Sequence, residues 1–262
     1  MIAAIIIYLF VFMYGVMVLR GVIEEKTGRV VEILVSSVKP FQLMAGKIIG
    51  IGTVGLIQFI VWIVLTFSIV YGAQVVLFPE TYTPTPLPEL QDSLGNNNHS
   101  LLQLQSDTNV DYAINLFQAI DGVNWTIMLS SFVFFFIFGY LLYASLFAAI
   151  GAFIDNDSET QQFVIPVTIP LMLTLFLLGN IVANPSGDIA LWLSFIPFTS
   201  PIAMMARLPF GVPYWHVLLS ACILILTCLI SIILSAKLYR TGILLYGKKI
   251  RLQTIISILM KN

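Results

Sequence analysis

The sequence predicts an all-α, polytopic transmembrane helix bundle with five spans and a re-entrant outer segment. Of the 262 residues, 59% are hydrophobic and only 10% are charged, whereas an average soluble domain is about 25% charged. The charges are clustered, which leaves apolar runs of the roughly 20 residues that a helix needs to cross a bilayer. These runs show no period-two alternation, so they predict helices rather than barrel strands. This composition excludes a soluble enzyme, and the net charge of −1 excludes a nucleic-acid binder.

Five runs are apolar enough to span a membrane, and they cover residues 2–19, 48–71, about 126–153, about 163–183 and 217–236. Residues 188–207 suggest a sixth span. However, Pro197 and Pro201 divide this stretch into two pieces of about eight residues, because proline interrupts a helix. We therefore expect segment 184–215, which includes Pro197, Ser200, Pro201 and Arg207, to form a re-entrant or outer-surface helix pair.

The positions of the cations predict the orientation. Eleven of the twelve Lys and Arg residues lie in residues 20–47 and 237–262, and five spans place both segments on one side. By the positive-inside rule, that side is cytoplasmic. We expect the chain to lie in the cell membrane. The outer loop, residues 72–124, carries six acids and no cation. The tail, residues 237–262, is basic and amphipathic, which is typical of a helix lying on the inner, anionic lipid surface.

This topology places Met1 outside the cell, directly before a span. A start of this kind without a cytoplasmic flank or a cleavage pattern is unusual. We therefore expect the chain to lack an upstream span and whatever follows that span.

Two stripes of small residues predict close helix packing. Gly46 and Gly50 form a G-x-x-x-G pair in the second span, and Ala144, Ala148 and Ala152 form a similar stripe in the third. Residues 50–55 also match G-x-G-x-x-G, but a dinucleotide site requires this motif between a strand and a helix. Packing is therefore the better interpretation.

Residues for catalysis are scarce. There is no nucleotide-binding G-x-x-x-x-G-K-[ST] motif, and the only histidines are His99 and His216. Glu24 to Arg29 match the E-E-x-x-x-R motif of intramembrane proteases, but no histidine stands in a matching context, so a charged helix face is favoured. Cys222 and Cys228 fit small packing residues. The sequence thus predicts no catalytic residue, no metal ion and no cofactor.

The loop at residues 20–47 mixes Glu24, Glu25, Arg29 and Glu32 with apolar residues. An amphipathic helix along the inner membrane surface and an ordinary anchoring loop fit this composition equally well.

Four segments resemble the type-2 ABC exporter permeases, and most closely the sodium-extrusion branch of that family. The first is the charged loop, with Glu24-Glu25-Lys26, Arg29, Glu32-Ile33-Leu34, Ser36-Ser37-Val38, Pro40 and Gly46-Lys47-Ile48. The others are Glu159-Thr160-Gln161-Gln162 with Pro166, then Pro197-Phe198-Thr199-Ser200-Pro201 with Met204, Arg207 and Gly211, then Tyr239-Arg240-Thr241-Gly242-Ile243-Leu244. They occur in the family's order and on the expected sides.

The resemblance implies a permease subunit of an ATP-driven ABC exporter, without its first helix and outer domain. It also implies a second permease copy and a separate cytoplasmic ATP-binding subunit that hydrolyses ATP and contacts Glu24, Glu25, Arg29 and Glu32. A non-transporting scaffold, an accessory subunit or an inactive permease fragment is the alternative. Sodium, peptides, drugs and lipids all stay open as the substrate.

Overall fold

In a computed structural model, the chain is described over residues 1–28, 38–77, 125–154 and 157–244. It divides into two compact units, of which the first comprises Met1–Leu56 with Thr126–Asn262 and the second Ile57–Trp125. Most described residues belong to the first unit, and all contacts discussed below lie within it.

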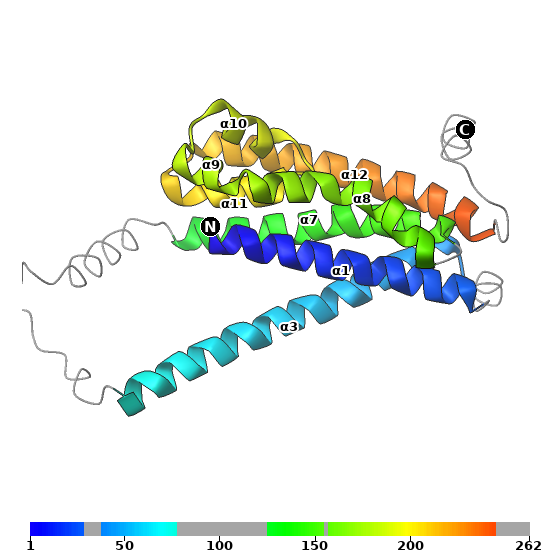
Figure 1. Ribbon diagram of the computed structural model, residues 1–262, viewed down its shortest axis with the longest axis horizontal. Coiled ribbons are helices and arrows are strands. Elements are labelled where there is room, and N and C mark those ends of the chain that lie inside the picture. The colour runs from blue at the N-terminus through cyan, green and yellow to red at the C-terminus, as the bar shows by residue number, and fades with distance from the viewer. Residues whose placement is uncertain (29–37, 78–124, 155–156, 245–262) are drawn as a thin grey trace, which may run out of the picture. The chain divides into compact units, whose positions relative to one another are not determined.

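The described residues contain helices and no strand (Figure 1). Five helices are long and apolar enough to cross a membrane, which confirms the predicted all-α class and the five spans. The long helices are α1 (Ile2–Thr27), α3 (Pro40–Leu77), α7 (Trp125–Phe153), α8 (Asp157–Phe176) and α12 (Tyr214–Leu244); the short ones are α9 (Leu178–Ala183), α10 (Asp188–Phe195), α11 (Ser200–Arg207) and the 3₁₀ turn η2 (Leu208–Phe210).

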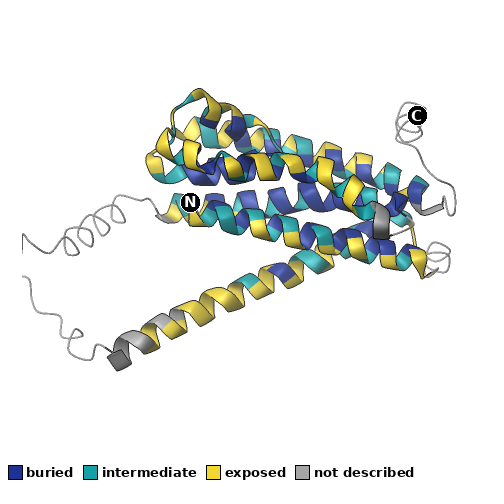
Figure 2. Cartoon of the chain, in the orientation of Figure 1, coloured by how far each residue is buried: buried dark blue, intermediate teal, exposed yellow. Residues whose placement is uncertain are grey.

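Helix α7 is the core of the first unit, because it has the largest buried share of the five spanning helices. Phe135, Tyr143 and Phe147 are fully buried. The ring of Phe147 packs where α1 has Gly15, and a Cβ atom at Gly15 would lie 2.5 Å from it. Figure 2 shows the buried residues concentrated on the inner faces of α1, α7 and α11. A glycine opposite a large aromatic side chain therefore sets the distance between α1 and α7.

The ends of three helices differ from the predicted spans. Helix α1 continues to Thr27 and α3 already begins at Pro40, so both ends of segment 20–47 belong to the long helices, and residues 29–37 lie outside the described part. Helix α12 likewise continues to Leu244, so the predicted tail begins as part of this helix, and residues 245–262 lie outside the described part. Glu, Lys and Arg favour helices, which lets a spanning helix continue beyond its apolar run.

Segment 184–215 contains two short helices, as the prolines predict. Helix α10 and helix α11 each have eight residues, and Pro197 lies between them. Pro201 occupies the first turn of α11, where the missing N–H has no helical partner to lose.

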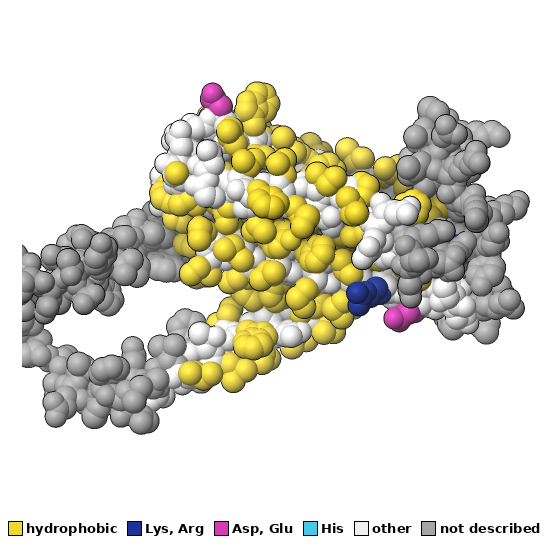
Figure 3. Space-filling view, in the orientation of Figure 1, with side chains coloured by type: hydrophobic (Ala, Val, Ile, Leu, Met, Phe, Trp, Pro, Cys, Tyr) yellow, Lys and Arg dark blue, Asp and Glu magenta, His cyan; other side chains and the backbone are white. Residues whose placement is uncertain are grey.

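The surface of the described residues is dominated by hydrophobic side chains in the view of Figure 3, where charged side chains appear only near its two ends. This distribution is the one expected for helices whose flanks face lipid and whose ends face water.

Candidate functional site

The end of α1, the start of α3 and the ends of α7 and α12 lie at the same end of the first unit (Figure 1). Charged side chains of α1 and α3 lie at this end. We call Glu24, Glu25, Lys26 and Lys47 the charged end. The Nζ atom of Lys47 in α3 lies 2.7 Å from Oε2 of Glu25 in α1, and the two side chains are 12% and 27% exposed, respectively. This partly shielded ion pair joins the last turns of α1 to the second turn of α3.

The side chain of Lys26 points into the protein, whereas that of Glu24 is exposed. Lys26 is 2% exposed, and its Nζ donates a 2.7 Å hydrogen bond to the carbonyl oxygen of Ala152 near the end of α7. The carbonyl groups of the last helical turn have no partner within the helix, so a cation there satisfies an acceptor and interacts favourably with the helix dipole.

Glycines bring three helices close together at this end. A Cβ atom at Gly151 of α7 would lie 2.9 Å from the carbonyl oxygen of Leu19 in α1. A Cβ atom at Gly242 of α12 would lie 2.9 Å from the carbonyl oxygen of Ala152. Any larger residue at either position would therefore separate the backbones beside the charged end.

Tyr239 in α12 is fully buried at this end of the bundle. Its hydroxyl group has no hydrogen-bond partner among the described residues. A buried hydroxyl group without a partner is costly, and the resemblance that includes Tyr239 does not indicate its burial.

At the other end of the unit, α11 is almost entirely buried and packs against α1 and α10. The loop before it is fixed by two hydroxyl groups. Tyr143 donates a 2.6 Å hydrogen bond to the carbonyl oxygen of Phe198, and Thr199 donates one of 2.6 Å to that of Leu193. Pro201 packs against Gly139 of α7, where a Cβ atom would be 3.0 Å away.

Arg207 is a buried cation at the end of α11, with 2% of its surface exposed. Nε donates a 2.7 Å hydrogen bond to the carbonyl oxygen of Pro185, and Nη1 donates one of 2.9 Å to Oγ of Ser194. Burial lowers the pKa of the guanidinium group from its ordinary value, but arginine stays charged at neutral pH. Arg207 thus ties α11 to α10 and to the turn before it.

The family model for the ABC-2 family transporter protein matches residues 1–237 of the chain. The chain belongs to the ABC-2 transporter family. It is therefore a multi-pass membrane protein of the ABC transporter class, which agrees with the resemblance found in the sequence.

Two relatives of this ABC-2 family chain are uncharacterized proteins. MJ1024 of Methanocaldococcus jannaschii is 27% identical over 247 residues, which are 94% of this chain and 49% of that protein. YhaP of Bacillus subtilis is 31% identical over 244 residues, which are 92% of this chain and 50% of that protein. The chain thus spans about half the length of these relatives. No solved structure matches it.

The predicted contact residues of this ABC-2 protein are only partly described. Glu24 is exposed and Glu25 pairs with Lys47, whereas Arg29 and Glu32 lie outside the described residues. The sequence did not indicate that Lys26 is buried. The signals in the sequence were its position directly after two acidic residues and the spacing of the apolar residues along α1.

The two small-residue stripes have different surroundings. Ala144, Ala148 and Ala152 are fully buried in α7. Gly46 and Gly50 are exposed, and nothing lies within 4 Å of a Cβ atom at either position. The close contact on α3 occurs instead at Gly52, where a Cβ atom would lie 2.5 Å from the ring of Tyr140. The predicted packing of Gly46 and Gly50 therefore has no partner within the described residues.

The structure does not bring His216 to Glu24 and Glu25. Lys26 bonds to Ala152, which packs against Gly242, so the charged end lies at the last turns of α12. His216 stands in the first turn of this helix, roughly 39 Å away at 1.5 Å per residue. Among the described residues, no three His, Cys, Asp or Glu side chains are grouped as metal ligands.

Proposed function

We propose that this chain is the permease subunit of an ATP-driven ABC exporter and that it moves its substrate outward across the cell membrane. The observation that carries the proposal is the family match over residues 1–237. The charged end then faces the cytoplasm, because most cations of the sequence flank it.

The charged end is suited to contact a cytoplasmic ATP-binding subunit. Glu24 is exposed, and the two residues that follow it are held by other helices: Glu25 by Lys47 of α3 and Lys26 by Ala152 of α7. A partner that bound Glu24 would therefore act on α1, α3 and α7 together. Such binding can shift the transporter between two states only by the difference between its affinities for them.

The proposal also covers a second permease copy, the branch of the family and the extent of the contact with the ATP-binding subunit. A second permease copy would pack against the exposed Gly46 and Gly50, where small residues permit close helix approach. The sodium-extrusion branch, with an additional first helix and outer domain, follows from the resemblance alone. Arg29 and Glu32 would extend the contact with the ATP-binding subunit.

The proposal is tested with a matched pair of charge reversals. Glu24→Lys changes an exposed acid at the charged end, and Asp188→Lys changes an exposed acid at the other end of the unit. Glu24 and Asp188 form no ion pair with another described residue, so both variants should insert and fold like the wild type. We expect Glu24→Lys to reduce copurification of the ATP-binding subunit and Asp188→Lys to leave it unchanged.

Each other result has a definite meaning. Undiminished copurification with Glu24→Lys would reject the contact, and a loss with Asp188→Lys alone would invert the proposed orientation. Association without substrate movement in reconstituted vesicles would support the non-transporting alternative.

A further inference from the structure

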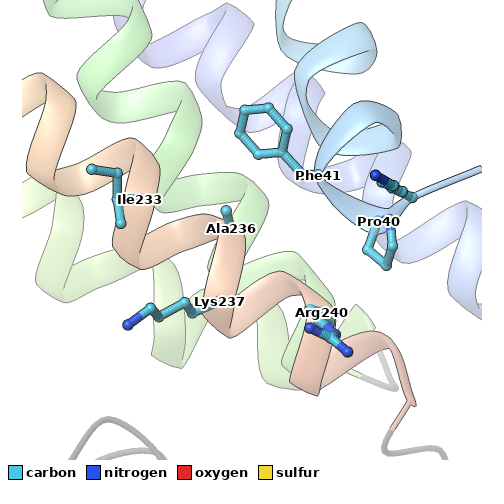
Figure 4. A pocket seen from close by; sticks show the side chains of 7 residues that line it. Pro40, Phe41, Ile233, Ala236, Lys237 and Arg240 are labelled. Atoms are coloured by element: carbon cyan, nitrogen blue, oxygen red, sulfur yellow. The ribbon is translucent and has the colours of Figure 1, made fainter. Parts of the chain in front are cut away.

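A cleft of about 730 Å³ opens between the start of α3 and the end of α12. Figure 4 shows Pro40 and Phe41 on one side and Ile233, Ala236 and Lys237 on the other. The four apolar residues among these offer hydrocarbon surface to whatever occupies the cleft, and Phe41 is 51% exposed and Ile233 61% exposed. The apolar part of the lining favours an apolar chain.

Three cations complete the lining, namely Lys39, Lys237 and Arg240. All three side chains are exposed, and none of them pairs with an acidic residue of the described chain. No described lining residue is acidic. The described part of the cleft therefore presents positive charge without a compensating acid, in contrast to Lys26 and Lys47, which contact other parts of the protein.

The cleft lies at the ends of two helices that are long and apolar enough to span a membrane. The apolar segment of α3 begins at Pro40, and that of α12 ends at Gly242. Residues at such positions lie at the level of the lipid headgroups. Cations at this level attract the anionic lipids of a membrane surface.

We propose that this cleft binds one anionic phospholipid, with its phosphate group on Lys39, Lys237 and Arg240 and an acyl chain against Phe41 and Ile233. The combination of charges and apolar surface selects this occupant. Free phosphate would leave the apolar residues unused, and a zwitterionic lipid brings no net negative charge to the three cations. The inference rests on membrane insertion and is independent of the proposed transport activity.

The test uses the full chain, purified from membranes in mild detergent and analysed by native mass spectrometry with added phosphatidylglycerol or phosphatidylcholine of the same chain length. The wild type should retain phosphatidylglycerol preferentially. Arg240→Gln should weaken this retention about fivefold, and the triple variant with Lys39→Gln and Lys237→Gln should weaken it about a hundredfold if the cations act independently.

Arg20→Gln is the matched control, because it removes an exposed arginine of α1 that does not line the cleft. It should leave retention within twofold of the wild type. Phe41→Ser should reduce retention without any change of charge. Excess inorganic phosphate should not displace the lipid, since it cannot use the apolar side.

Three results would overturn the inference: equal retention of both lipids by the wild type, unchanged retention by the triple variant, or complete displacement by inorganic phosphate. If the triple variant kept the lipid and lost the ATP-binding subunit, the cleft would be a protein-docking surface instead.

Discussion

The ammonium group of Lys26 and the carbonyl oxygen of Ala152 lie 2.7 Å apart and join positions separated by 126 residues. This bond fixes the end of α1 against the end of α7, directly beside Glu24 and Glu25. The proposed docking residues are thus placed by a buried cation that does not itself reach the surface.

Replacing Lys26 by methionine should lower the free energy of unfolding by about 1–3 kcal/mol, because the carbonyl group of Ala152 loses a charged donor in a buried position. Denaturant titration in detergent measures the change. Lys39→Met is the control, because this exposed lysine makes no such contact. It should change stability by less than about 0.5 kcal/mol, and an equal loss in both variants would contradict the assigned role of Lys26.

The ion pair between Glu25 and Lys47 should show a coupling energy of about 1 kcal/mol in a double-mutant cycle, since both side chains are only partly exposed. We expect Glu25→Lys and Lys47→Glu to be destabilising singly and the double exchange to recover much of the loss. Additive effects would show that the two side chains do not interact.

Gly15→Ala should destabilise the protein by about 1–3 kcal/mol, because the new Cβ atom would meet the buried ring of Phe147 at 2.5 Å. Gly50→Ala is the matched variant, with nothing within 4 Å of its Cβ atom. It should leave stability unchanged or raise it by up to about 1 kcal/mol through helix propensity. The unfolding midpoints of the two variants, measured side by side, check this contrast.

Arg207→Ala should lower stability by about 2–4 kcal/mol, because two hydrogen bonds to a charged donor are lost and Ser194 and the carbonyl group of Pro185 lose their partner. Arg240→Ala, at an exposed position, serves as the control in detergent without anionic lipid. Limited proteolysis between α9 and α11 should increase with Arg207→Ala alone. Equal resistance to protease in both variants would show that Arg207 does not hold this segment.

The order and number of the spans could be predicted from the sequence, because hydropathy over about 20 residues reports directly on bilayer crossing. The two eight-residue helices α10 and α11 were equally predictable, since Pro197 and Pro201 interrupt any longer helix. The ends of α1, α3 and α12 were not, because charged residues also favour a helix, and hydropathy does not report how far a helix continues beyond its apolar run.

The candidate site was predictable only in part. Glu24 and Glu25 could be identified as a charged segment, whereas the burial of Lys26 and Arg207 depends on carbonyl groups supplied by distant residues. The cleft between α3 and α12 joins residues almost 200 positions apart along the chain, and no local pattern indicates such a pairing.

The amino-acid sequence by itself determined that this protein is a membrane-spanning helix bundle with most of its cations gathered in two segments beside the spans, because apolar length and charge position act locally on insertion. The tertiary structure decided that Lys26 bonds inside the protein and that Lys39, Lys237 and Arg240 stay exposed at the cleft. The reason is physical. A lysine ammonium group is satisfied inside the protein only where a carbonyl oxygen of another helix lies within hydrogen-bond distance, as that of Ala152 does for Lys26. The packing of α1, α7 and α12 decides where this happens.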